Sequence, residues 1–451
     1  MKTDAEILDA VRKSPHMKVR VAVTDVDGIL RGKFMHKDKF LAAVESGFGF
    51  CDVVFGWDCA DVAYDNGTFT GWHTGYPDAQ AQIDVQTFRT IPWNQATPFF
   101  LADFVDKKGQ PLEVCPRQLL RRQIARAEEK GYSPKFGMEF EWFNFKETPQ
   151  SWADKHYMNP TPLTPGMFGY SVLRTSENQE YFTALMDQMR EYGVPIEGLH
   201  TETGPGVYEA AIVYSDALEA ADRAVLFKTG AKEIAHRFGI MPSFMAKWSN
   251  QLPGCGGHVH QSLMDSKTNK SRFYEEKAPH LISAEFRSYV AGQLHCLPEI
   301  LPFFAPTINS FKRLVDGYWA PTKVTWGVEN RTTALRVIPG SSKSTRLETR
   351  VPGADVNPYL AVAACLGAGL YGIEHKLELK QTPVQGNGYA DKTATKLPGS
   401  LQAATDRMAE SKVAREIFGE TFVRHFAESR YWEWKKFQEA VTQWELQRYF
   451  E

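Results

Sequence analysis

In KFGMEFEWFNF, residues 135–145, two glutamates alternate with large apolar residues, a pattern that predicts a β-strand. Glu139 and Glu141 share one face of that strand, while the opposite face is apolar. Apolar residues flank the carboxylates on both faces, which is typical of a buried strand; a solvated strand face is the alternative. Because adjacent buried carboxylates repel each other and require cations, the stretch predicts a metal site.

Three further stretches carry candidate ligands. In GLHTETGPGVYEAAIVY, a Gly-Pro-Gly turn can bring Glu202 and Glu209 toward one point, although a surface loop explains the same pattern. LPGCGGHVHQSL places His258 and His260 on one strand face, after glycines that let a ligand approach the backbone. In STRLETR, Glu348 alternates with two arginines, a pattern that is also typical of a salt-bridge ladder.

The length of 451 residues and a change of pattern near Lys108–Gly109 predict two domains, at 1–108 and 109–451. The first contains a short helix, a hairpin with its turn near Asp27–Gly28 and further short strands, which indicates a small α+β domain. The second opens with a helix after Pro116 and alternates irregularly between helices and strands. We expect helices at 178–192, 215–238, 283–298 and 356–374, a surface loop at 379–399 and a helical tail at 400–451.

The composition argues against several functional classes. A formal net charge of -2 gives no sign of a nucleic-acid or membrane-surface binder. The six cysteines are scattered without a CxxC pair, which argues against a zinc site, a redox motif or a disulfide framework. Because the chain also lacks a signal-peptide core and any apolar stretch of membrane-spanning length, we expect a cytoplasmic protein.

Six motifs, in order, resemble those of the glutamine synthetase family: GMEFEWF, ETGPGVYE, GGHVHQS, NSFKRLVDGYWAP, ENRTTALRV and STRLETRVPGADVNPYLAVAA. The resemblance covers nearly the whole chain. It implies an α+β fold with an N-terminal β-grasp-like domain and a catalytic domain in which helices flank a curved antiparallel sheet, a half-barrel. It also implies a homo-oligomer, typically a dodecamer of two hexameric rings, with each active site between neighbouring subunits.

The same resemblance assigns the six candidate ligands to two divalent ions, Mg²⁺ or Mn²⁺. Phosphate oxygens of the co-substrate ATP and water would complete these oxygen-rich shells. The two implied groups of ligands are Glu141, Glu202 and Glu209 for one ion, and Glu139, His258 and Glu348 for the other.

Further residues would contact the substrates. Arg313 and Arg350, with the backbone of Gly254, would bind glutamate, because guanidinium groups suit carboxylates. Arg331 and Arg336 would meet the phosphates of ATP and, together with Arg313, are the candidate catalytic residues. The nucleotide site would also be lined by Tyr214, His260, Ser262, Lys343 and Arg346.

The implied reaction has two steps. The γ-carboxylate of glutamate attacks the γ-phosphorus of ATP, which gives γ-glutamyl phosphate and ADP, and an amine then displaces phosphate to form an amide. The acyl phosphate must be kept from water, which in the family is the task of a flap. Here the flap is RLVDGYWAP, residues 313–321.

The sequence departs from the family pattern where the amine would bind. Trp319 stands in the flap at a position where enzymes that make glutamine have a glutamate, and Cys51 or Asp52 falls where their ammonium-binding aspartate lies. Fewer anionic groups and an added indole disfavour NH₄⁺ and suit an amine with a hydrocarbon body. Pro253 and Val207 also replace an asparagine and a glutamine of the pattern.

We therefore expect a ligase that makes a γ-glutamyl amide from an organic amine. A glutamine synthetase with an altered ammonium site is the alternative. A non-catalytic structural member of the fold is a third interpretation, but it would have no reason to keep the six ligands and the arginines. Tyr389 lies in the loop where bacterial relatives are adenylylated, but its surroundings match that site poorly, so we expect no such regulation.

Overall fold

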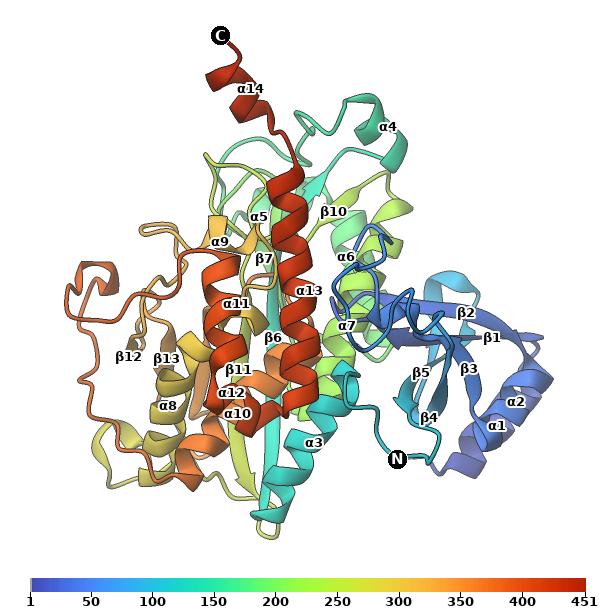
Figure 1. Ribbon diagram of the computed structural model, residues 1–451, viewed down its shortest axis with the longest axis horizontal. Coiled ribbons are helices and arrows are strands. Elements are labelled where there is room, and N and C mark those ends of the chain that lie inside the picture. Colours follow the sequence, from blue (N-terminus) through green and yellow to red (C-terminus); the bar gives the residue numbers. More distant parts are fainter. Residues whose placement is uncertain (1) are drawn as a thin grey trace.

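The computed structural model describes residues 2–451, which form two β-sheets and the helices around them (Figure 1). The smaller sheet has the strand order β2-β1-β5-β4-β3; its β1–β5 pair is parallel and the other pairs are antiparallel. With a helix after the first hairpin, this is the predicted β-grasp-like arrangement. Its elements are α1 (Asp4–Lys13), β1 (Lys18–Thr24), β2 (Leu30–His36), α2 (Lys37–Ser46), β3 (Phe48–Cys51), η1 (Asp52–Phe55), β4 (Asp78–Ile91), η2 (Pro92–Asn94) and β5 (Thr97–Val105).

The hairpin predicted near Asp27–Gly28 is formed by β1 and β2, and its turn covers residues 25–29. The Asp25 carboxylate accepts hydrogen bonds from the backbone N–H groups of Asp27 (3.1 Å) and Ile29 (2.8 Å). The connection is therefore a longer turn that the Asp25 side chain stabilises, and not the two-residue turn that Asp-Gly pairs often make.

The larger sheet has the strand order β12-β13-β14-β11-β6-β8-β7, and β9 and β10 also pair with β6. Every pair is antiparallel except β12–β13, because residues 329–334 return the chain to the end at which β12 began. The sheet is thus the predicted curved half-barrel with one parallel pair at its edge. Its strands are β6 (Tyr132–Phe145), β7 (Ile196–Thr201), β8 (Val207–Ile212), β9 (Ser215–Asp216), β10 (Met241–Ser243), β11 (Gly257–Asp265), β12 (Trp326–Val328), β13 (Leu335–Ile338) and β14 (Arg346–Thr349).

Helices follow the predicted segments closely. The long central helices α6, α7, α8 and α10 each begin and end within two residues of the expected bounds. Two short helices between 149 and 177 were not predicted. The α-helices of this part are α3 (Pro116–Glu129), α4 (Pro149–Asp154), α5 (Val172–Glu177), α6 (Gln179–Glu191), α7 (Ala217–His236), α8 (Ala284–Cys296), α9 (Ser310–Arg313), α10 (Pro358–Glu374), α11 (Leu401–Glu410), α12 (Lys412–Phe418), α13 (Glu420–Glu439) and α14 (Gln443–Tyr449). The 3₁₀ turns are η3 (Pro279–Leu281), η4 (Leu297–Glu299), η5 (Leu301–Phe303) and η6 (Gly388–Ala390).

Strand β6 separates the core from the site. Phe140 and Trp142 are fully buried and pack on Phe227 of α7, with ring centroids 6.1 and 5.4 Å away. Because successive side chains alternate, Glu139 and Glu141 project from the opposite face of the same strand. The apolar face is thereby anchored on a helix, and the two carboxylates are held on a rigid support.

Arg117 of α3 connects the two sheets. Its guanidinium is 2% exposed and donates to Asp103 (2.7 Å) and Asp84 (2.8 Å) of the small sheet and to Asp222 (2.7 Å) of α7. Since α3 begins after the small sheet ends, we propose that the domain division falls at the predicted position, 108–109. No helix within residues 2–451 combines the length and the apolar character needed to cross a membrane.

We expect the substitution Arg117→Met to lower the free energy of unfolding by about 3–5 kcal/mol, because it leaves the buried Asp222 without its cation and leaves Asp84 and Asp103 with Arg121 alone. Urea unfolding followed by circular dichroism measures the change. Arg122→Met is the matched control on the same helix, since Arg122 donates only to the carbonyl oxygen of Glu113. Equal losses in both variants would contradict the role assigned to Arg117.

Candidate active site

The six candidate ligands lie on or beside five neighbouring strands, β14-β11-β6-β8-β7. The strand register pairs Glu139 with His258 and Glu141 with Glu209. Residues far apart in the chain are therefore brought into one row across the sheet. Along the row the ligands are Glu348 on β14, His258 on β11, Glu139 and Glu141 on β6, Glu209 on β8 and Glu202 directly after β7.

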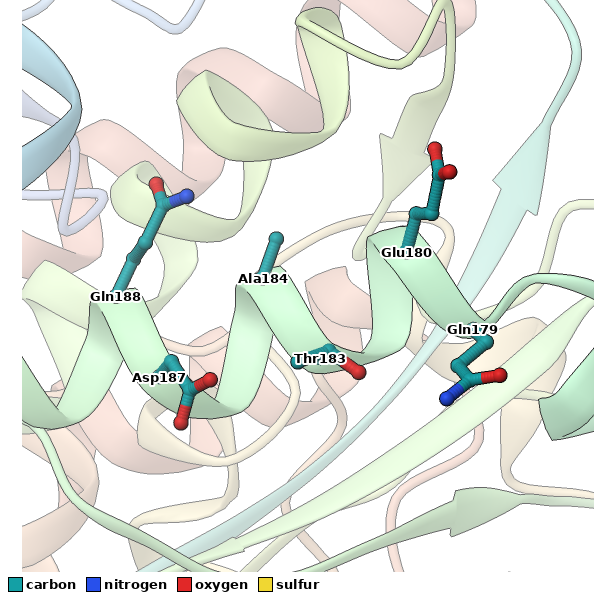
Figure 2. A pocket seen from close by; sticks show the side chains of 6 residues that line it. All are labelled: Gln179, Glu180, Thr183, Ala184, Asp187 and Gln188. Carbon is teal, nitrogen blue, oxygen red and sulfur yellow. The ribbon is translucent and has the colours of Figure 1, made fainter.

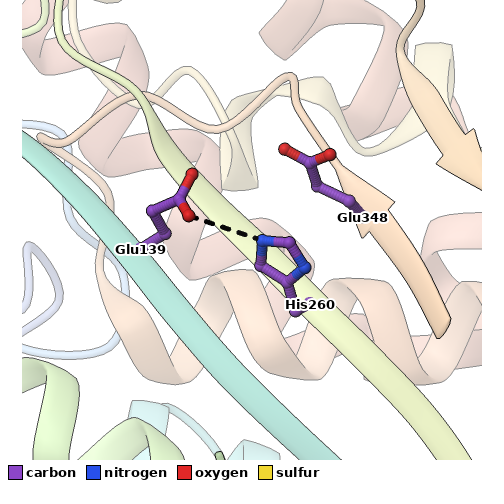
Figure 3. Close-up of side chains that lie close together, drawn as sticks. All are labelled: Glu139, His260 and Glu348. Carbon is purple, nitrogen blue, oxygen red and sulfur yellow. Dashed lines mark ion pairs between the residues drawn. The ribbon is translucent and has the colours of Figure 1, made fainter. Parts of the chain in front are cut away.

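At one end of the row, histidines and carboxylates converge. His258 Nδ1 lies 3.0 Å from Glu139 Oε1 and 3.5 Å from Glu348 Oε1. His260 Nε2 lies 3.8 Å from Glu139 Oε2, and both side chains lie close to Glu348 (Figure 3). Ligand atoms of Glu139, His260 and Glu348 all lie within 4.8 Å of one another, so these three residues could hold a metal ion. The structure thus adds His260, which the sequence assigned to the nucleotide, to the possible ligands.

The charge of this end is balanced by the chain itself. Burial opposes the ionisation of Glu139, yet the hydrogen bond with His258 and the charges of both histidines lower its pKa to about 2. Burial also opposes the ionisation of Glu348, but the charge of Arg350 holds its pKa below the ordinary value. Arg336 Nη1 donates to Glu348 Oε2 at 3.0 Å, and Arg350 donates to the other oxygen. Both carboxylates are therefore ionised and compensated.

The other end of the row carries three carboxylates with little compensation. Glu141 accepts a hydrogen bond from the N–H of Gly256 and Glu202 from the N–H of Thr203, both at 2.8 Å. Burial and then the charges of neighbouring carboxylates raise the pKa of Glu209 to about 10 and raise that of Glu202. A divalent cation would reverse this repulsion, and carboxylate oxygens suit Mg²⁺ or Mn²⁺. The chemistry of these three residues therefore fits the predicted ion.

The residues assigned to glutamate lie together beside the row. Arg313 is 4% exposed, and its guanidinium donates to the carbonyl oxygens of Val351 (2.8 Å) and Arg350 (3.3 Å). Gly254 lies against it: a Cβ at this position would come within 2.8 Å of Arg313 Cγ and 2.4 Å of the Ala246 carbonyl oxygen. Only glycine fits here, so the backbone at 254 forms part of the wall around Arg313.

The residues assigned to the nucleotide are more dispersed. Arg346 Nε donates to His260 Nδ1 at 3.3 Å, and Ser262 follows on the same face of β11. Lys343 is exposed in the segment before β14, and Tyr214 is exposed just after β8. The structure thus groups His260 and Arg346 closely, whereas Lys343 and Tyr214 are exposed and make no such contact with them.

An aromatic pair that the sequence did not single out borders the acidic end. Tyr170 stacks on His200, with ring centroids 4.5 Å apart and planes at 8°, and His200 Nε2 lies 3.4 Å from Glu209 Oε1. Burial and the charge of Glu202 raise the pKa of Tyr170, whereas the charge of Arg331 opposes this, so the exposed Arg331 side chain reaches the same end. In the sequence, the signal that could have found this pair is the position of His200, two residues before Glu202.

The sequence also placed Tyr389 in a surface loop, but its hydroxyl is buried and has no hydrogen-bond partner among residues 2–451. Burial raises the pKa of Tyr389, while the charges of Arg350 and Arg313 and the backbone of Trp319 oppose this rise. The loop at 379–399 therefore reaches the arginines and the flap.

The amine-site candidates do not meet within one chain. Trp319 lies on the flap, is 57% exposed and has a left-handed φ of +62°. Asp52 is buried and accepts a hydrogen bond from the Thr70 hydroxyl at 2.8 Å, and Cys51 Sγ donates to the Tyr76 carbonyl oxygen at 3.5 Å. Figure 1 shows β3, which precedes Asp52, and α9, which begins the flap, on opposite sides of α13.

A surface hollow of about 440 Å³ lies elsewhere (Figure 2). All the side chains that line it come from the single helix α6, and none comes from the strands that carry the carboxylates. It is therefore unrelated to the acidic row. Its lining residues are Gln179, Glu180, Thr183, Ala184, Asp187 and Gln188.

Known proteins resemble this chain in sequence and in overall fold. The family model "Glutamine synthetase, catalytic domain" matches residues 113–449. Type-1 glutamine synthetase 2 of Dictyostelium discoideum is 54% identical, over 100% of this chain and 87% of that protein. Glutamate–isopropylamine ligase of a Pseudomonas species is 37% identical (99% and 97%), and gamma-glutamylethanolamide synthetase of Streptomyces coelicolor is 38% identical (96% and 92%). A solved structure of a GmaS/ADP complex has a TM-score of 0.85 at 26% identity, covering 98% of this chain and 99% of that one.

We expect the metal-free protein to lose stability as the pH rises from about 5 to 9. Because the pKa of Glu209 is raised to about 10, the folded state keeps a proton that the unfolded chain releases near its ordinary pKa. Stability therefore falls as the pH rises between these two values. Mn²⁺ or Mg²⁺ favours the ionised form, so added metal should raise the melting temperature more at pH 9 than at pH 6.

Differential scanning fluorimetry at both pH values, with and without metal, measures these shifts. Glu209→Gln should flatten the pH dependence and weaken the response to metal. Asp187→Asn, on the exposed face of α6, is the control that should change neither. A metal response that is independent of pH in the unsubstituted protein would contradict this account of Glu209.

Proposed function

The chain belongs to the glutamine synthetase family, whose members are ATP-dependent ligases that form C–N bonds, and on that premise we propose that it joins glutamate to an organic amine. The product would be a γ-glutamyl amide, formed through γ-glutamyl phosphate with release of ADP and phosphate. Two of its relatives are named for reactions of this kind, with isopropylamine and with ethanolamine.

Residues along the acidic row would have separate roles in the reaction. Arg313 and Arg350, with the Gly254 backbone, would hold the carboxylates of glutamate beside β14. Arg336 and Arg331 would neutralise charge on the phosphoryl group as the γ-carboxylate of glutamate attacks it and ADP leaves. Divalent ions, when bound, would supply charge neutralisation at the phosphate oxygens. They would be held by Glu141, Glu202 and Glu209 and by Glu139, Glu348 and His258 or His260.

The observation that carries the choice of an organic amine is the composition of the flap. Its one carboxylate, Asp316, is engaged with the Thr322 hydroxyl, and the next two side chains beyond Gly317 are the aromatic Tyr318 and Trp319. The flap therefore offers an amine mainly apolar surface, because its one carboxylate lies before Gly317 and position 319 carries no carboxylate with which to bind NH₄⁺ or accept a proton from it. An amine with a hydrocarbon body would bury that body against the indole.

The alternative is a glutamine synthetase that uses ammonium, which the 54% identity to a type-1 glutamine synthetase favours. A non-catalytic member of the fold is disfavoured, because the six ligands and the arginines are retained in one row. The two ligase hypotheses differ only in the acceptor, so they are separated by kinetics.

We further propose that the protein is a homo-oligomer, a dodecamer of two hexameric rings, in which Cys51 and Asp52 of one subunit complete the amine site of the next. Within one chain, β3, which precedes Asp52, and α9, which begins the flap, lie on opposite sides of α13 in Figure 1, and this separation supports the proposal. The C-terminal helix α14, which projects from the body of the molecule, offers a surface for assembly. Its exposed apolar residues are Trp444, Leu446 and Tyr449, followed by Phe450.

In a coupled assay of phosphate release, we expect kcat/KM for at least one amine with an apolar body to exceed that for ammonium by about tenfold or more. The panel contains ammonium, methylamine, isopropylamine, ethanolamine, putrescine and aniline, each with glutamate, ATP and Mg²⁺. Ammonium outperforming every amine would overturn the proposed acceptor and favour glutamine synthesis.

Two substitutions of Trp319 separate the loss of the indole from the gain of a carboxylate. Trp319→Ala should lower kcat/KM for apolar amines without improving the use of ammonium. Trp319→Glu should also raise kcat/KM for ammonium, because it restores an anion at the flap. Unchanged amine preference in both variants would show that Trp319 does not face the acceptor.

Removal of residues 441–451 should reduce the molar mass in solution, measured by size-exclusion chromatography with light scattering. The reason is that the truncation deletes the exposed apolar surface of α14 that we assign to a subunit contact. A variant that lacks only Glu451 is the control. An unchanged mass after the longer truncation would exclude α14 from the contacts that hold the assembly together.

A further inference from the structure

Lys247 is a buried cation that the account above does not use. It lies in the connection between β10 and β11, its side chain is 7% exposed, and its Nζ has no hydrogen-bond or ion-pair partner among residues 2–451. Two hydrogen bonds fix its backbone: its N–H donates to Asn309 Oδ1, and Asn309 Nδ2 donates to its carbonyl oxygen, both at 2.7 Å. The backbone of Lys247 is therefore held by Asn309 at the start of α9.

The neighbours of Lys247 belong to the glutamate site and the flap. Its Nζ lies 4.1 Å from the ring centroid of Tyr318, which is a flap residue. The charge of Arg313, together with burial, lowers the pKa of Lys247, so the two cations lie near each other. The residue before it, Ala246, forms the wall against Gly254. Lys247 thus lies beneath the flap, next to the residues assigned to glutamate.

Two buried cations side by side require an anion. Arg313 makes its hydrogen bonds to backbone carbonyl oxygens, and no carboxylate within residues 2–451 forms an ion pair with Arg313 or Lys247. A buried charge without a partner is costly, and a ligand that brings a carboxylate removes that cost. Pro253, beside Gly254, has neither an N–H group nor a polar side chain, so this wall offers few other donors.

We propose that Lys247 Nζ, together with Arg313, binds a carboxylate of the glutamate substrate, and that Tyr318 covers this contact when the flap is closed. The inference rests on the proposed function and names a further substrate-binding residue for it. A phosphate of ATP is the less suitable occupant, because Arg336, which is assigned to phosphate, and Arg346, which is assigned to the nucleotide site, project from β13 and β14 beside the histidines.

The test compares Lys247→Met, Lys247→Arg and a control, Lys232→Met, in the full-length protein. Methionine keeps the length of the side chain and removes its charge. Lys232 is the matched control because its ammonium also lies over an aromatic ring, that of Phe244 at 5.8 Å. It differs in its place, since Lys232 belongs to α7, which packs on the apolar face of β6. The measurements are KM for glutamate, ATP and amine, and the Kd of L-glutamate by calorimetry with ADP and Mn²⁺ present.

We expect Lys247→Met to raise both KM and Kd for glutamate by about tenfold or more, with KM for ATP within about twofold. Lys247→Arg should retain most of the affinity, and Lys232→Met all of it. The melting temperature of ligand-free Lys247→Met should equal or exceed that of the unsubstituted protein, because an unpaired buried charge has been removed. If Lys247 only stabilised the fold, Lys247→Met would lower the melting temperature of the ligand-free protein.

Glutamate affinity that is unchanged in Lys247→Met, or KM for ATP that rises as much as KM for glutamate, would overturn this assignment. Failure of the proposed function has a different signature: the unsubstituted protein would consume ATP without dependence on glutamate or would not consume it at all. The calorimetric comparison needs no turnover, so it tests Lys247 even in a protein that binds L-glutamate without converting it, and an unsubstituted protein that binds no L-glutamate would overturn the assignment.

Discussion

Glu141 and Glu209 face each other across two hydrogen-bonded strands, with Glu202 close by at the end of a third. Burial opposes the ionisation of Glu209, and the like charges of neighbouring carboxylates add to this effect, so the pKa of Glu209 rises to about 10. The arrangement is tolerable for two reasons. One is that Glu209 can hold a proton; the other is that a divalent cation can replace that proton. The need for a cation at this point links the stability of the sheet to the chemistry that we propose for it.

The remainder of the sheet supports this row. On one face of β6, Phe140 and Trp142 pack on α7 and fix the strand in place. On the other face, the histidines of β11 and the arginines of β13 and β14 compensate Glu139 and Glu348. Charge therefore changes gradually along the row, from arginine-balanced carboxylates at one end to uncompensated carboxylates at the other. A phosphorylated substrate with bound metal ions would match this gradient. Its phosphate oxygens would meet the arginines at one end, and its metal ions would meet the uncompensated carboxylates at the other.

The region beneath the flap has the opposite imbalance. Lys247, Arg313 and Arg350 bring positive charge into a buried space, and the Tyr389 hydroxyl and the flap aromatics complete its border. A dicarboxylate substrate would neutralise these cations. The second substrate would then meet Trp319 from the outer side, where we propose that a neighbouring subunit contributes Asp52.

Much of the fold could be predicted because it rests on local signals. The alternation of 135–145 predicts β6, Pro116 and Asn357 stand at the starts of helices, and the Asp-Gly pair predicts the first hairpin. The six motifs likewise identified the family. These features depend on the periodicity of side chains or on short stretches of chain, so neighbouring letters carry the information.

Other features depend on contacts between distant segments and were decided by the tertiary structure. Strand register pairs Glu139 with His258 and brings His260 close to Glu139 and Glu348. The sequence had assigned His258 to a metal ion and His260 to the nucleotide. Burial of the Tyr389 hydroxyl and of Lys247 follows from how loops pack on α9 and the flap, and no local pattern marks either residue. The sequence by itself therefore determined which residue types are present for the chemistry. Their charge balance and their neighbours were decided only by the folded chain, because both depend on long-range packing.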